Sequence, residues 1–289
     1  MDITRDRSEL AKAMRRYPGA PPDALMEDLA EQLGQECEAE PPVDLRLVAS
    51  MQGISDITET FSSHAGCLIN NAGVLRIEVC ATDNPQRQRF TIGHEISHTL
   101  LPGFELEQNF RCNPGGSTPK RSAAINVEWL ADVGGSELLL PRRFVTARFA
   151  QEPFGWDAIE RVADDYGASL EATARRFVRL SPTPAIFVRL KHATSKNDPN
   201  PTLRVHSSSS SPSLDQFIPP NKSVSRTHPV HDAVIGEDVD TVADMRSLRV
   251  PGRYRIAARR YPLPTREGET VMSVMLIGLN MDASKGSTR

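Results

Sequence analysis

The chain has 289 residues, of which 39% are hydrophobic, enough for one or two domains with sizeable cores. Its formal net charge of −3 argues against a nucleic-acid-binding protein dominated by basic charge, although it leaves room for a local basic patch. The sequence has no apolar run of transmembrane length, and its N-terminus is polar rather than signal-like, so we expect a cytoplasmic protein with no membrane partner.

We expect residues 1–40 to form an N-terminal helical extension. A leucine at every fourth position, with acids between, predicts a helix over residues 21–38. The Pro41-Pro42 pair separates this helix from a second one that begins at Val43, because proline lacks a backbone donor and disfavours the helical conformation in its predecessor. Short strands are predicted next, near residues 67–70 and 74–79, which makes residues 41–149 an α+β core.

The run His94-Glu95-Ile96-Ser97-His98 is the most informative motif of the chain. On a helix, residues four apart share a face, so both imidazoles can point at one ion while Glu95 flanks the remaining coordination position. Zinc binds imidazole readily, and a carboxylate beside an open position can accept a proton from water there. The motif therefore predicts a zinc hydrolase, with His94 and His98 as metal ligands and Glu95 as the catalytic base.

The alternative interpretation makes the two histidines ordinary polar positions on an amphipathic helix. Ile92, Ile96 and Leu100 mark a core-facing side of that helix, which leaves the histidines on a different side.

A zinc site needs a third protein ligand, and a second predicted helix, over residues 128–141, offers one. Glu128 and Asp132 share a face of this helix, and Gly134-Gly135 lie inside it at a cost of about 1 kcal/mol each. Such a cost suggests that two helix backbones approach closely. Glu128 would then reach the ion, and Asp132 would hydrogen-bond a ligating histidine. The alternative is a solvated face that also includes Glu137.

These segments resemble the ImmA/IrrE family of bacterial zinc metallopeptidases. The likeness covers roughly residues 40–181 and includes the Arg89-Phe90-Thr91 run before the histidine motif. The resemblance implies a zincin-like core in which His94, His98 and Glu128 hold Zn²⁺ and Glu95 is the general base. Asp132 stands where the family usually has asparagine, and Gly134-Gly135 replace a phenylalanine–alanine pair.

The resemblance also implies a function. The expected substrate is a protein, typically an XRE-like helix-turn-helix repressor, which is cut to derepress stress, mobile-element or toxin–antitoxin genes. One alternative is a transcriptional regulator that binds DNA or protein without cleaving and uses zinc only for structure. The glutamate after the first histidine favours the enzyme, since a structural zinc site needs no base there. Another alternative is a zinc hydrolase of small molecules.

Residues 150–181 predict a helix-turn-helix-like hairpin, broken at Gly167 and capped at Ser169. Three arginines of its second helix would face phosphates or bases in a DNA-binding role, but neighbouring acids nearly cancel their charge, which favours packing on the core. These arginines are Arg175, Arg176 and Arg179.

The segment between the two metal-site helices, residues 104–124, is polar and is predicted to be a mobile loop over the cleft. It contains Cys112, the cysteine with some prospect of redox reactivity. The four cysteines show no Cys-x-x-Cys spacing, so we expect free thiols rather than a second metal site.

Residues 182–289 have the marks of a smaller β-rich domain. Strands are predicted at residues 185–190, 202–206, 254–259 and 270–279. The serine-rich run Ser207–Ser213 is predicted to be a flexible loop. Similar proteins carry a GAF-like C-terminal domain, so a sensor role is our hypothesis here. His228 and His231 are predicted to be surface histidines on a loop rather than metal ligands.

Overall fold

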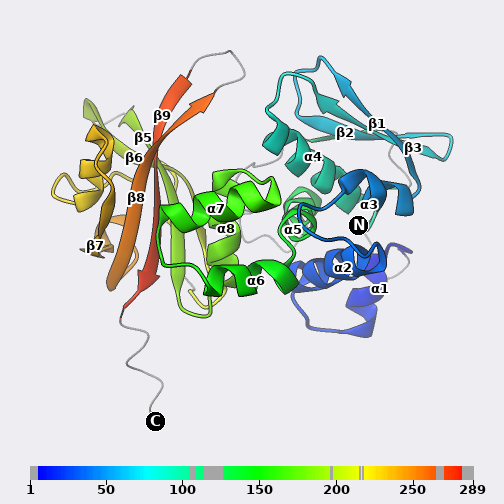
Figure 1. Cartoon of the computed structure of the whole chain (residues 1–289), viewed down its shortest axis with the longest axis horizontal. Helices are drawn as coiled ribbons and strands as arrows, with labels where there is room; N and C mark the ends of the chain where they lie inside the picture. The colour runs from blue at the N-terminus through cyan, green and yellow to red at the C-terminus, as the bar shows by residue number, and fades with distance from the viewer. Residues whose placement is uncertain are drawn as a thin grey trace, which may run out of the picture. The chain divides into compact units, whose positions relative to one another are not determined.

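The structure is a computed structural model, and it describes residues 6–104, 109–112, 126–195, 198–214, 216, 218–264 and 270–281. The chain divides into two compact units (Figure 1). The first comprises Met1–Val145 and Ala163–Ser169, and the second comprises Thr146–Val162 and Leu170–Arg289. Each unit has helices and its own sheet, which confirms the predicted α+β class. Within the described ranges, no helix has the length and hydropathy of a transmembrane span.

The first unit combines helices with a small sheet. Its helices are α1 (Glu9–Arg16), α2 (Pro22–Glu36), α3 (Leu45–Met51), α4 (Pro85–His98) and α5 (Val127–Leu139), followed by α6 (Arg142–Ala150), which runs on into the second unit. The sheet has the order β1-β3-β2-β4, with β1 (Ile54–Thr60), β2 (Gly66–Asn71), β3 (Val74–Cys80) and β4 (Asn109–Cys112). The β1–β3 pair is parallel, and the other pairs are antiparallel. The two helices and two strands predicted before the histidine motif are present as α2, α3, β2 and β3, whereas β1 was not predicted.

Helix α4, which carries the two histidines, and helix α5, which carries Glu128, each begin at an asparagine cap. The Asn84 side chain accepts a hydrogen bond from the backbone N–H of Arg87, and Pro85 occupies the first helical position of α4. The Asn126 side chain accepts one from the N–H of Trp129 at the start of α5. Because each cap satisfies otherwise unpaired helix donors, the local sequence determines where these two helices start.

The predicted mobile loop over residues 104–124 is partly a strand. Residues 109–112 form β4, which pairs with β2 from Gly66↔Cys112 to Ile69↔Asn109. A polar strand at the sheet edge lacks the hydrophobic alternation by which strands are recognised in a sequence, which is why it was missed. Residues 105–108 and 113–124 of the predicted loop and the Cys112 side chain lie outside the described residues. The other cysteines, Cys37, Cys67 and Cys80, form no disulfide bond, in agreement with the prediction of thiols, and all three are buried.

The second unit is built on a five-stranded sheet with the order β6-β5-β9-β8-β7, in which every pair is antiparallel. Its strands are β5 (Ala185–Ser195), β6 (Asp198–Ser210), β7 (Val239–Asp244), β8 (Arg253–Pro264) and β9 (Thr270–Asn280). All four predicted strands are present, and β7 was missed. Two short 3₁₀ helices, η1 (Pro229–Ile235) and η2 (Arg246–Leu248), complete the unit.

The predicted helical hairpin consists of α7 (Trp156–Tyr166) and α8 (Leu170–Leu180). Gly167 lies between them with a φ of +60°, a left-handed conformation that glycine adopts without strain. Trp156 on α7 and Val178 on α8 share a hydrophobic cluster with Phe187 of β5 and Ile277 of β9, so the hairpin covers one face of this sheet. The Trp156 indole N–H also donates to the carbonyl of Ala257 on β8, at 3.0 Å.

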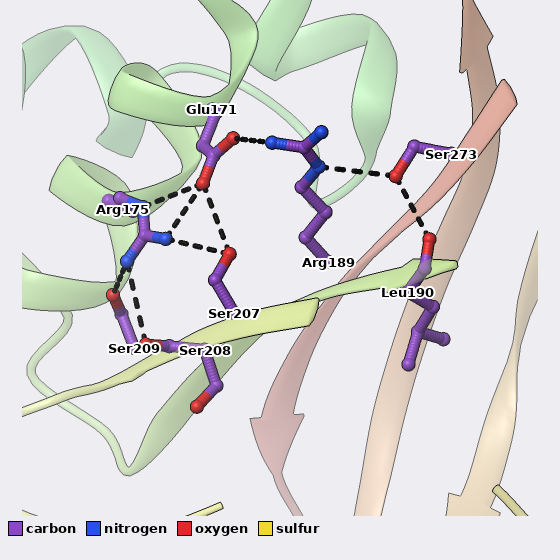
Figure 2. Close-up of polar contacts among 8 residues, drawn as sticks. All are labelled: Glu171, Arg175, Arg189, Leu190, Ser207, Ser208, Ser209 and Ser273. Atoms are coloured by element: carbon purple, nitrogen blue, oxygen red, sulfur yellow. Dashed lines mark hydrogen bonds and ion pairs between the residues drawn. The ribbon is translucent and has the colours of Figure 1, made fainter. Parts of the chain in front are cut away.

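Part of the serine-rich run belongs to a strand, so its prediction as a flexible loop was wrong. Residues Ser207–Ser210 extend β6 and pair with residues 186–189 of β5. Arg175 on α8 donates to the hydroxyls of Ser207 and Ser209, and it forms an ion pair with Glu171 (Figure 2). Composition predicted a linker because serines in linkers are solvated, whereas these hydroxyls have protein partners from another element.

The hairpin arginines are largely engaged within the second unit. Arg175 is held by Glu171 and the serines of β6, and Arg176 is only 1% exposed. Side chains committed to such contacts are not available to phosphates. This arrangement agrees with the packing role that the charge balance favoured over DNA contact.

His228 is buried, so its prediction as a surface histidine was wrong. It is the N-cap of η1: its Nδ1 accepts a hydrogen bond from the backbone N–H of Val230 at 3.2 Å, and its Nε2 lies 3.4 Å from the sulfur of Met245. The ring of His231 is less buried and donates through Nε2 to the carbonyl of Ser225 at 3.0 Å. Burial and the nearby His231 lower the pKa of His228 to about 4.

We predict that this cap makes the second unit acid-sensitive. The folded-state pKa of His228 lies below the ordinary value, so the unfolded chain binds more protons between pH 6.5 and 4, and stability falls as the pH decreases through that window. The loss should be about 2 kcal/mol between pH 7.5 and 4.5. Urea unfolding followed by Trp156 fluorescence in a Trp129→Phe background measures it.

The matched variant for this test is His228→Asn, since asparagine caps helices and does not titrate. Its stability should fall by about 2 kcal/mol less than that of the parent over the same pH range. His231→Asn should keep most of the parent's pH dependence, because burial is the larger cause of the lowered pKa of His228 and the cap itself remains. Identical pH profiles for the parent and His228→Asn would contradict the prediction.

Candidate metal centre

Helices α4 and α5 cross at glycines, as the Gly134-Gly135 pair predicted. A Cβ built on Gly135 would lie 2.7 Å from the backbone nitrogen of His94 and 3.0 Å from the carbonyl carbon of Gly93. A Cβ on Gly134 would lie 2.6 Å from the hydroxyl of Ser97 and would also collide with the Met26 side chain of α2. The two helices can therefore approach this closely only without side chains at these positions.

This crossing brings together three predicted site residues. The Nε2 atoms of His94 and His98 are 3.1 Å apart, and the Glu128 carboxylate oxygens lie 3.6 Å and 3.7 Å from them. The ligating atoms of all three residues lie within 4.8 Å of one another. A tetrahedral ion with bonds of about 2.0–2.1 Å to its ligands separates neighbouring ligand atoms by about 3.3 Å, so the three side chains fit a zinc ion.

Burial is unequal across the three side chains. His94 and His98 are each 1% exposed, whereas the Glu128 side chain is 49% exposed. The histidines therefore do not occupy solvated positions of an amphipathic helix: Ile96 and Leu100 are buried, and α5 covers the histidine side of α4 as well. The centre combines two imidazoles in a low-dielectric environment with one carboxylate that solvent reaches.

Asp132 contacts His94 on the side away from the other ligands. Its Oδ1 lies 2.8 Å from His94 Nδ1, so the Nδ1–H donates to the carboxylate and Nε2 is the ring nitrogen that a metal would bind, displacing any proton there. Burial opposes a charge on His94, but the Asp132 hydrogen bond and the Glu128 carboxylate outweigh it and raise the pKa of His94 to about 9. Burial and the charge on His94 lower the pKa of His98 to about 3. The surroundings of His94 thus favour a positive charge at this position.

Replacing Asp132 tests its role in orienting His94. We expect Asp132→Ala to weaken zinc binding by about 10–100-fold, the usual effect of removing a residue that holds a metal ligand in place. Asp132→Asn should weaken it less, because the amide oxygen still accepts from Nδ1–H. Competition with a chromophoric chelator measures both constants. Wild-type affinity in Asp132→Ala would show that Asp132 has no such role.

Glu95 is not one of the three clustered side chains, but its charge acts on the neighbouring His94. Its side chain is fully buried, and Oε1 lies 3.4 Å from the position that a Cβ on Gly66 of β2 would occupy. That Cβ would also collide with Thr91 of α4. The glycine therefore leaves room for Thr91 of α4 against β2, next to Glu95, a role that its position in the sequence did not reveal.

Among the residues that the structure describes, one group of three or more His, Cys, Asp or Glu side chains is arranged to hold a metal. It consists of His94, His98 and Glu128, and Glu95 is not a member.

Comparison with known proteins identifies the segment around this centre. Residues 52–178 match the family model described as the IrrE N-terminal-like domain, Peptidase_M78. This segment is an IrrE N-terminal-like domain. It contains the candidate ligands, Glu95 and Asp132, and it confirms the family resemblance drawn from the sequence motifs. The IrrE N-terminal-like domain also includes the α7–α8 turn.

A search of curated proteins finds no match to the chain. Among solved structures, one described as a Mycobacterium tuberculosis transcriptional regulator is similar, with a TM-score of 0.57 and 16% sequence identity. The alignment covers 96% of this chain and 81% of that one. At this identity the likeness concerns the fold, and it extends beyond the IrrE N-terminal-like domain.

Proposed function

We propose that the protein is a zinc endopeptidase that cleaves a helix-turn-helix repressor of the XRE type. The observation that carries the proposal is the convergence of His94, His98 and Glu128 inside an IrrE N-terminal-like domain, with ligating atoms within 4.8 Å of one another. Asp132 adds support, since it holds His94 in the tautomer that a metal requires. Cleavage of the repressor would release the stress, mobile-element or toxin–antitoxin genes under its control.

In the proposed mechanism, each polar side chain has a separate task. Zinc held by His94, His98 and Glu128 would polarise the scissile carbonyl and acidify the attacking water. The Glu95 carboxylate accepts the proton of that water and delivers it to the leaving amine. Its full burial places this carboxylate in a low-dielectric environment, which strengthens its attraction for the proton. Asp132 keeps His94 oriented throughout.

The domain plan proposed for this peptidase has four parts. Residues 1–40 are the helical extension, residues 41–149 the zincin-like core, residues 150–181 the helix-turn-helix-like hairpin and residues 182–289 a GAF-like sensor. A five-stranded antiparallel sheet in the last part supports an independent role for it. We propose that this part receives the activating signal.

A second candidate function is a transcriptional regulator that binds DNA or protein without cleaving, with zinc serving structure. The similar solved structure is described as a transcriptional regulator, which favours a regulatory setting for either candidate. The two differ in their need for Glu95: a structural site requires the ligands and no base.

Co-expression with the repressor encoded nearest to the gene distinguishes the two candidates. Wild type and Glu95→Gln are compared by gel and mass spectrometry, with the zinc content of both proteins determined. The endopeptidase should cut the repressor once, Glu95→Gln should leave it intact, and both should hold about one zinc. A stable complex that is never cut, despite full zinc occupancy of the wild type, would favour the binding regulator.

A further inference from the structure

Arg89 joins α4 to two segments of the first unit that are distant in sequence. Its Nε donates to the carbonyl of Gly167 in the α7–α8 turn, at 3.2 Å, and its Nη2 donates to the carbonyl of Val43 before α3, at 3.0 Å. The side chain is partly buried and lies on α4 five residues before His94. A single guanidinium therefore fixes the helix of the candidate ligands against two separate backbone segments.

The residue of the turn that Arg89 contacts is a glycine, which leaves space for the guanidinium. Gly167 has a φ of +60°, and a Cβ there would lie 3.1 Å from Arg89 Nε. The turn itself is closed by hydrogen bonds from Gly167 N–H to the carbonyl of Asp164 and from Ala168 N–H to that of Ala163. Glycine thus serves both the turn conformation and the close approach of the guanidinium.

The turn has an unusual place in the chain. Ala163–Ser169 packs as part of the first unit, whereas Thr146–Val162 before it and Leu170–Arg289 after it belong to the second. Arg89 therefore binds the short segment at which the chain enters and leaves the first unit. Ser169 is bonded directly to Leu170, the first residue of α8, so the end of this turn is covalently linked to the start of that helix.

The start of α8 is anchored within the second unit. Glu171, two residues after Ser169, accepts hydrogen bonds from Arg175 on its own helix, from Ser207 on β6 and from Arg189 on β5 (Figure 2). Arg189 in turn donates to the hydroxyl of Ser273 on β9. Hydrogen bonds thus connect the first turn of α8 to β5 and β6 directly, and to β9 through Arg189.

We propose that Arg89 is a positioning residue of the metal centre, through which the α7–α8 turn sets the place of α4 against α5. An effect of Arg89 on cleavage rests on the proposed function. An effect of Arg89 on metal binding does not depend on it. Both histidines lie on α4 while Glu128 lies on α5, so a small shift of α4 changes the separation between ligands. A change in the second unit that moves Glu171 would reach the metal centre by this path.

The test is a double-mutant cycle read out on metal binding. Arg89→Ala and Gly167→Ala each disturb the same contact from one side, and each should weaken zinc affinity about tenfold or more. The double variant should be no weaker than the weaker single variant, because the contact can be lost only once. Cobalt(II) added to the metal-free proteins should give a visible spectrum that differs from wild type in all three. Effects that simply add, or wild-type affinity and spectrum in Arg89→Ala, would overturn the proposal.

Two control variants separate the contact from general damage. Gly19→Ala also places alanine at a positive φ, +92°, with nothing within 4 Å, and Arg87→Ala removes an exposed arginine of α4 that pairs with Asp83. Both should keep wild-type zinc affinity and cobalt spectrum. If Arg89→Ala does not fold, Arg89→Lys replaces it: one nitrogen cannot serve both carbonyls, so an intermediate loss is expected. Wild-type affinity in Arg89→Lys would then count against the proposal.

Glu171→Gln tests the input from the second unit. Loss of the carboxylate charge weakens its hold on Arg175 and Arg189, so the cobalt spectrum should shift in the direction seen for Gly167→Ala. An unchanged spectrum would overturn the proposed path. These readouts remain valid if the wild type binds zinc but cleaves no repressor, so failure of the proposed function and failure of the coupling are distinguishable.

Discussion

Replacing Gly135 by alanine is expected to destabilise the first unit by about 3 kcal/mol, the upper end of the usual cost of overpacking, and to lower its zinc occupancy. The added Cβ would meet the backbone of His94 at 2.7 Å and that of Gly93 at 3.0 Å. Backbone atoms cannot rotate out of the way as a side chain can, so α4 and α5 must separate. Because the candidate ligands lie on both helices, their separation damages the metal centre together with the fold.

Chemical unfolding and zinc content measured on the same preparations test this expectation. The control is Gly34→Ala in α2, where a Cβ would meet nothing within 4 Å. Alanine there should stabilise the protein by about 1 kcal/mol through its higher helix propensity, with zinc content unchanged. A Gly135→Ala protein as stable as wild type, with full zinc, would mean that the helix crossing tolerates a side chain.

Glu128→Ala should lose zinc without losing stability: we expect zinc affinity to fall by more than about 100-fold, with little change in the stability of the metal-free protein. The affinity loss should exceed the 10–100-fold typical of residues that only orient a ligand, because one of three ligands disappears. The stability change should be small because the side chain is 49% exposed and Asp132 still holds His94 when the Glu128 carboxylate is removed. Removing an acid from the first turn of α5 costs about 0.3–1 kcal/mol in the helix dipole interaction.

A chelator competition and a urea titration on the metal-free protein measure the two effects. Glu9→Ala is a matched control, since Glu9 is also an acid in the first turn of a helix and is 52% exposed. It should repeat the small stability change and keep wild-type zinc affinity. Retention of tight zinc binding by Glu128→Ala would remove Glu128 from the ligand set.

Helix geometry was enough to predict from the sequence which side chains of the metal centre lie close together. Helical spacing alone brings His94 and His98 together, and two glycines in a helix indicated the crossing that brings Glu128 to them. The contact between Asp132 and His94 followed from the same geometry. The role of Gly66 was missed, because it depends on where β2 lies against α4, and no spacing within the chain encodes that.

The missed features of the fold depend on partners distant in sequence. β4 is a strand because β2 presents unpaired backbone groups to it, and the serines of β6 are ordered because β5 and Arg175 bind them. His228 is buried because it caps η1 and meets Met245, 17 residues away. The composition of such a segment does not show whether it is structured, because its structure depends on contacts with residues that are distant in the sequence.

The interleaved units determine how the protein can be divided. A cut after Leu180 follows the change in sequence character, but α7 and α8 share their hydrophobic cluster with the strands that would be removed. The shortened chain would present Trp156, Ile159 and Val178 to water, an apolar surface that promotes aggregation. Loss of activity in such a truncation would therefore report an exposed helical hairpin rather than a missing signal, and the C-terminal strands are better probed by point substitutions in the intact chain.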